Sequence, residues 1–112
     1  MTDPIRIEPR GQIIKDPYDW VVSQFVWDEH LEDGVELLSS GEFNIASVTE
    51  PGEEVPTLEI DEVMMVSGNR SVQFRLKGGT PNHAYNVAHR VQYGDAPEQR
   101  RERSFIVWVR EE

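Results

Sequence analysis

The chain of 112 residues contains no cysteine, which excludes several kinds of protein. A disulfide framework, a thiolate metal site and a cysteine nucleophile all require that side chain. No apolar run approaches the roughly 20 residues of a membrane-spanning helix. The N-terminus has Asp3 and Pro4 near its start and lacks the basic and then apolar pattern of a secretory signal. We therefore expect a protein made in the cytoplasm, with no signal peptide and no membrane partner.

Basic residues are missing from the middle of the chain. Between Asp28 and Asn69 there are twelve carboxylates and no lysine or arginine, whereas residues 70–112 carry eight basic and five acidic side chains. Phosphates are bound by lysine and arginine, so the middle segment argues against a nucleic-acid partner. Two interpretations of the charge stay open. The acidic segment is either a solvated face, or it meets the basic face of a neighbouring molecule.

Motifs for catalysis and metal binding are also missing. The three histidines are too scattered for a spacing such as H-E-x-x-H: they are His30, His83 and His89. No G-x-S-x-G sequence surrounds a serine. Asp61-Glu62 and Glu53-Glu54 lack the interleaved Asp-x-Asp pattern of a calcium loop. We therefore predict no enzyme activity, no cofactor and no metal site.

The last third of the sequence has a clear strand pattern, because apolar residues alternate with others along three runs. These runs are Val72, Phe74 and Leu76, then Tyr85, Val87, His89 and Val91, and then Phe105, Val107 and Val109. Turn residues Gly78–Asn82 separate the first two runs, and a polar loop from Asp95 to Arg103 precedes the third. Successive side chains of a strand point to opposite faces, so each run has one buried face. His89 is then a histidine at the core edge, bonded to the backbone.

Earlier segments add further short strands. They are Tyr18–Trp27, Val35–Leu38, the run of Phe43, Ile45 and Val48, and the run from Leu58 to Met65. About seven strands with breaks every 8 to 12 residues predict an all-β fold, an antiparallel β-sandwich. The spacing of Leu31, Val35 and Leu38 leaves a short helix open as an alternative in one segment.

The length suits a single domain. Residues 1–14 contain Pro4, Pro9 and Gly11 and few apolar anchors, so we expect an extended arm that adds an edge strand. Residues 15–112 form the sandwich domain. Tyr85 stands two residues before Val87, the arrangement in which immunoglobulin-type sandwiches bond a tyrosine hydroxyl back to the upstream backbone.

The order of several motifs resembles that of small immunoglobulin-like proteins encoded among bacteriophage structural genes, of the fibre-tail adaptor or head-tail completion type. The motifs are Lys15-Asp16-Pro17, a strand ending in Trp27, Asp33-Gly34, the run KGGTPNHAYNVAHRV and the run ERSFIVWV. The resemblance covers roughly residues 15–110. It implies an immunoglobulin-like fold and a structural role in the virion, and it carries no catalytic residues. The implied partners are other phage structural proteins, or further copies of the chain arranged as a ring.

Interface residues follow from strand alternation. Trp20 lies opposite Phe25 and Trp27 on its strand, and Ile106 and Trp108 lie opposite the apolar run of the last strand. Large apolar side chains that face away from a core are candidates for binding a partner. The basic cluster forms the second candidate: Arg100, Arg101 and Arg103. The alternatives are a sandwich that covers both faces, and a basic loop that only balances nearby glutamates.

Three functions remain open from the sequence. The first is an assembly adaptor in the phage tail, at the head-tail or fibre-tail connection. The second is a β-sandwich module that binds carbohydrate or another host-surface ligand. The third is an inhibitor whose acidic middle segment mimics nucleic acid.

Overall fold

The computed structural model describes residues 4–27, 31, 35–48, 57–66, 68–94 and 99–110. All regular structure within these residues is β-strand, which confirms the predicted all-β class. The strands are β1 (Ile5–Ile7), β2 (Gln12–Lys15), β3 (Val21–Val26), β4 (Glu42–Ser47), β5 (Leu58–Val66), β6 (Ser71–Gly78), β7 (His83–Tyr93) and β8 (Gln99–Val109).

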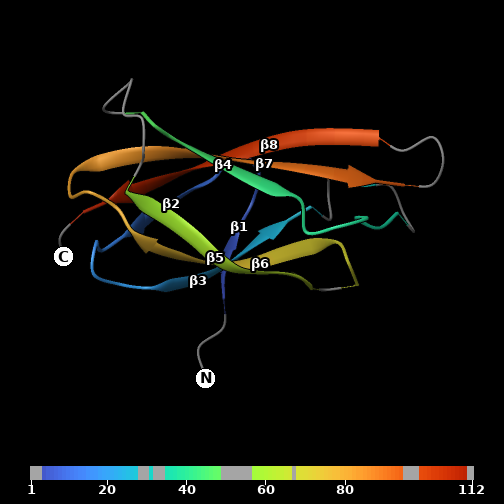
Figure 1. The fold of residues 1–112 in the computed structure, drawn as a ribbon, viewed down its shortest axis with the longest axis horizontal. Coiled ribbons are helices and arrows are strands. Elements are labelled where there is room, and N and C mark those ends of the chain that lie inside the picture. The colour runs from blue at the N-terminus through green and yellow to red at the C-terminus, as the bar shows by residue number, and fades with distance from the viewer. Residues whose placement is uncertain are drawn as a thin grey trace.

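The strands form two sheets of four strands each, packed as two layers (Figure 1). The first sheet has the order β1-β3-β6-β5, and the second has the order β2-β8-β7-β4. This arrangement confirms the predicted β-sandwich, but the sheets are mixed where purely antiparallel sheets were expected. β1 pairs in parallel with β3, and β2 pairs in parallel with β8, whereas the other pairs are antiparallel. The residues before Lys15 thus place one edge strand on each sheet.

The core lies between the sheets and is built from one face of each strand, as the period-2 pattern predicts. Fully or almost fully buried side chains come from the first sheet, the second sheet and the segment after β3: Phe25, Trp27, Val72, Phe74, Leu76, Tyr85, Val87, Val91, Phe105, Val107 and Val109. Phe25 packs edge-on against Trp27, with ring centroids 5.7 Å apart, and its ring also contacts Phe105 from the other sheet at 5.1 Å.

Three local predictions differ from the structure. The strand expected at Val35–Leu38 is reduced to an isolated bridge between Leu37 and Tyr93. The polar loop expected to reach Arg103 is shorter, because β8 begins at Gln99 and pairs with the whole length of β7. No helix occurs among residues 31 and 35–38, and residues 28–30 and 32–34 of the possible helix lie outside the described residues.

A hydrogen-bonded histidine joins the two sheets inside the core. The Trp27 indole N–H donates to Nδ1 of His89 at 3.0 Å, and Nε2 of His89 lies 2.7 Å from the Ser40 carbonyl oxygen. The indole can only donate, so Nδ1 is the acceptor and the ring proton sits on Nε2. Gly41 lets the Ser40 turn approach β7 this closely, because a Cβ at Gly41 would lie 2.4 Å from the Arg90 carbonyl oxygen. The prediction that His89 is bonded to the backbone is confirmed.

Two further polar side chains tie the sheets at one end of the sandwich. The buried Lys15 ammonium, at the end of β2, donates to the carbonyl oxygens of Asp16 and Gly78, each at 2.8 Å. Burial lowers the pKa of Lys15. The Tyr85 hydroxyl accepts a hydrogen bond from the Thr80 backbone N–H at 3.0 Å and shares another with the Thr57 hydroxyl at 2.9 Å. The predicted bond from Tyr85 to the upstream backbone is therefore present.

The buried histidine makes stability depend on pH. Burial lowers the pKa of His89 to about 4, whereas a histidine in an unfolded chain titrates near 6.5. Below pH 6.5 the His89 ring of the unfolded chain therefore binds a proton, whereas the buried ring of the folded chain stays neutral down to about pH 4. We expect the free energy of unfolding to fall by about 3 kcal/mol between pH 6.5 and 4 through this residue alone.

Urea unfolding at a series of pH values measures this effect. His89→Gln keeps one donor and one acceptor without a titrating ring, so its stability should fall less over the same range. His83→Gln is the matched control and should follow the native chain. Identical pH profiles for the native chain and His89→Gln would contradict the assignment.

Candidate functional site: the outer faces of the two sheets

An exposed tryptophan stands on the outer face of the first sheet. The Trp20 side chain is 64% exposed, just before β3. The Arg75 guanidinium carbon lies 4.6 Å from the centroid of its ring, and the Lys77 ammonium lies 5.0 Å away. Both cations project from β6, which pairs with β3. Cations over the face of an indole are attracted by its quadrupole, so the ring is held in place although it is open to solvent.

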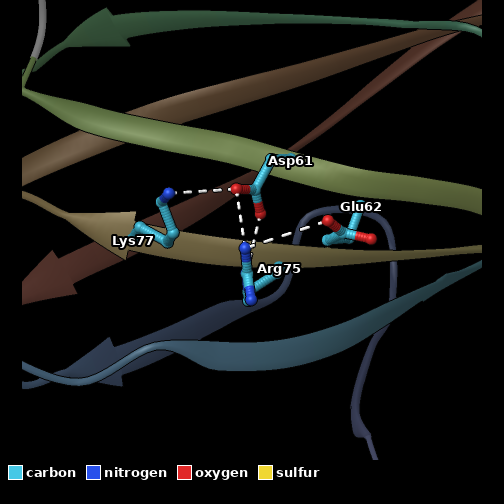
Figure 2. Close-up of polar contacts among 4 residues, drawn as sticks. All are labelled: Asp61, Glu62, Arg75 and Lys77. Carbon is cyan, nitrogen blue, oxygen red and sulfur yellow. Dashed lines mark hydrogen bonds and ion pairs between the residues drawn. The ribbon is translucent and has the colours of Figure 1, made fainter.

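A carboxylate on β5 fixes the two cations (Figure 2). Asp61 accepts two hydrogen bonds from Arg75, at 2.8 and 2.9 Å, and its second oxygen lies 3.0 Å from the Lys77 ammonium. These bonds, the one from Arg75 first, lower the pKa of Asp61 to about 2, so it stays ionised at any ordinary pH. Trp20, Asp61, Arg75 and Lys77 are called the Trp20 cluster below. Glu62 lies at its margin, 4.0 Å from Arg75.

An apolar row crosses the outer face of the second sheet. Its members are neighbours from β2 across β8 and β7 to the residue after β4: Ile14, Trp108, the buried Ala84, and Val48. Ile14 and Val48 are about half exposed, and Trp108 is partly exposed. We call these four residues the Trp108 row. Ile106 is partly exposed on the same face of β8.

The Trp108 ring is also held in place. Its indole N–H donates to Oε1 of Gln12 at 3.0 Å, and the Arg110 guanidinium carbon lies 5.4 Å from the ring centroid. Each sheet therefore presents one tryptophan whose orientation is fixed by polar neighbours.

Charged residues occupy the other end of the outer face of the second sheet. Arg90 on β7 stands between Glu42 on β4 and Glu102 on β8 in the strand register. Nε and Nη2 of Arg90 lie 2.9 and 2.8 Å from one oxygen of Glu102. Beside this ladder lies an open hollow of about 370 Å³, which is lined by the turn at residues 39–42 and by Arg90 and Arg100.

The predicted interface residues fall into separate groups. Trp20 lies on one side of the sandwich, and Trp108, Ile106 and Arg100 lie on the other. The basic cluster is divided, because neighbouring residues of β8 point to opposite faces. Arg100 lines the hollow, whereas the Arg101 guanidinium lies 5.1 Å from the Tyr93 ring centroid. Arg103 donates to the carbonyl oxygen of Glu102 at 2.8 Å.

Several residues of these surfaces were not found from the sequence. Asp61 was considered only as an oxygen ligand for calcium, whereas its carboxylate binds Arg75 and Lys77. The alternation of Arg75 and Lys77 with buried residues was a usable signal, because it placed both cations on one outer face. Ile14 was assigned to the arm, and its position beside Trp108 depends on a parallel pairing that the sequence did not indicate.

Metal-binding groups of side chains and membrane-spanning helices are both absent from the part of the chain that the structure describes. No three His, Asp or Glu side chains there are placed to hold a metal ion. The same residues include no helix that is long and apolar enough to cross a membrane.

The fold and these two faces define a β-sandwich that presents fixed aromatic side chains on its outer surfaces, as binding and assembly modules do. The family model described as Podophage GP4 fiber-tail adaptor protein gp77 matches residues 15–108. The match covers most of the chain, so the chain belongs to this family of phage fibre-tail adaptors, and it is a structural adaptor of the virion. The predicted resemblance to phage structural proteins is confirmed. No curated protein matches the chain.

Removal of the Asp61 charge should release the Trp20 ring. In Asp61→Asn the amide oxygen accepts fewer and weaker hydrogen bonds, so Arg75 and Lys77 lose the charge that holds them beside the indole. We expect greater motion of the Trp20 side chain, measured as a lower heteronuclear NOE of its indole N–H by NMR. Glu62→Gln is the matched control and should change this signal little. If this NOE is the same in Asp61→Asn as in the native chain, the Asp61 charge does not hold the Trp20 ring in place.

Proposed function

We propose that the chain joins a fibre component to a tail component of the virion and binds them through opposite faces of the sandwich. The observation that supports this is the presence of a fixed, solvent-accessible tryptophan on each outer face, in the Trp20 cluster and in the Trp108 row. A connector needs two surfaces that can be occupied at the same time. Two sheets packed back to back supply such surfaces, because the core separates them.

The chemistry of each face supports a role in binding. Tryptophan and arginine dominate the energy of many protein interfaces, and both residue types occur on both faces. A ring whose orientation is fixed before binding loses little conformational entropy when a partner packs on it.

We also propose that this role involves no catalysis, and that the chain acts within the assembled particle. The proposed partners, a fibre component and a tail component, are proteins of the same phage. The chain contributes contact surface and rigidity, and it contributes no reacting group.

Each tryptophan should control a different partner. Trp20→Ala and Trp108→Ala each remove a central aromatic contact, so each should weaken the binding of one component at least tenfold and leave the other unchanged. The measurement is calorimetry or surface plasmon resonance with purified fibre and tail proteins of the phage. Circular dichroism and thermal unfolding establish that the variants are folded.

Leu38→Ala serves as the control, because Leu38 is 48% exposed and belongs to neither face as defined above. It should leave both affinities unchanged. Loss of the same partner in both tryptophan variants, or of neither partner, would contradict a connector with two faces.

Arg100 should contribute to binding on the second face by electrostatics. Arg100→Glu reverses a charge at the hollow beside Arg90, so we expect slower association with the partner of the Trp108 face. The loss should shrink as salt is raised, because exposed charges are screened. Arg101→Glu is the comparison, since Arg101 lies over Tyr93 and away from the hollow. Equal effects of the two reversals would contradict this role of Arg100.

A further inference from the structure

The short strand β1 is joined to β2 by a strained turn. The Gly11 backbone N–H donates to the Glu8 carbonyl oxygen at 2.9 Å, which closes a four-residue turn with Pro9 and Arg10 at its centre. Arg10 has a φ of 68°. Proline followed by a residue of positive φ is the pattern of a type II turn, which ordinarily places glycine or asparagine at that second position. An arginine there is held in a conformation that L-residues rarely adopt.

β1 is short and lies at the edge of its sheet. It comprises three residues, which pair in parallel with Ser23–Phe25 of β3. Of its two isoleucines, Ile7 is buried in the core, whereas Ile5 is 44% exposed. On the other side of the turn, β2 is bonded to β8. The Ile106 N–H donates to the Gly11 carbonyl oxygen at 3.0 Å, and β2 ends at the buried Lys15.

We propose that β1 is exchanged between copies of the chain, so that Ile5–Ile7 of one molecule pairs with β3 of its neighbour. Opening of the turn would relieve the strain at Arg10, would break the 2.7 Å hydrogen bond from the Arg10 backbone N–H to the Ser104 carbonyl oxygen, and would extend residues 8–11, which then span about 13 Å. Short hinge segments under strain favour this kind of exchange. β2 remains on its own sheet, and β1 becomes a link between molecules.

When β1 leaves the edge of β3, the β1 strand of a second copy of this chain takes its place. The edge of β3 and the core position of Ile7 fit this particular three-residue segment, and an identical molecule supplies it with the same hydrogen bonds and the same buried side chain. The family match begins at Lys15, after both β1 and the turn. The exchange of β1 involves residues outside the matched region. It is separate from the proposed binding through the two outer faces and does not depend on that binding.

Cysteine cross-linking tests the exchange, because the chain contains no cysteine of its own. Arg6 on β1 stands opposite Gln24 on β3. Arg6→Cys and Gln24→Cys are prepared as separate proteins, mixed, incubated and oxidised. Exchange predicts a covalent dimer linked between positions 6 and 24, identified by peptide mass spectrometry, in a yield that rises with protein concentration.

The double variant with both cysteines in one chain provides the geometric control. A disulfide within one chain shows that positions 6 and 24 can be bridged. If the double variant closes within one chain and the mixture gives no dimer linked between 6 and 24, the exchange is wrong. Linkage of 6 to 6 and 24 to 24 as often as 6 to 24 shows random collision and also overturns it.

Turn variants test the strain directly. A Cβ at Gly11 would lie 2.8 Å from the Glu8 carbonyl oxygen, so Gly11→Ala should open the turn and raise the yield of cross-linked dimer severalfold. Arg10→Gly accepts the positive φ and should lower the yield. Gly68→Ala introduces strain at a turn distant in sequence, at a φ of 69°, and should leave the yield unchanged. The same yield in Gly11→Ala and Arg10→Gly would overturn the proposal.

Discussion

The hydrogen bond between Trp27 and His89 crosses the core between the two sheets and constrains how they meet. A buried indole N–H without an acceptor is costly, so the two sheets must meet at a separation and register that bring these side chains together. The bond is continued to the backbone at Ser40 by the other ring nitrogen. The apolar pattern of each strand sets its inward residues, and strand alternation then decides which residues face outward.

The outer faces therefore follow from the core. Trp108 stands between two buried residues of β8, and polar side chains lie against both tryptophan rings. A connector between two components of a virion has to transmit position as well as bind, and rigid surfaces on a common core suit that task better than mobile loops. The parallel edge strands at residues 5–15 are the exception, since β1 is short and is joined to β2 by a strained turn.

Much of the fold could be predicted from the sequence. The alternation of apolar residues in Val72–Val109 identified the strands and the core face, and Tyr85 and His89 made the backbone contacts expected of them. The division of the basic cluster was missed because Arg100 and Arg101 were placed in a loop, where alternation does not apply. Pairing with β7 extends β8 through these residues and sends them to opposite faces.

The sequence by itself determined the class of fold and the inward residues of most strands, because these depend on periodicity within single segments. Only the tertiary structure decided that Asp61 binds Arg75 and Lys77, that Ile14 lies beside Trp108, and that the two tryptophans lie on opposite sides. Those facts depend on which strands pair and in which register. Pairing is a property of segments far apart in the chain, and local sequence pattern does not encode it.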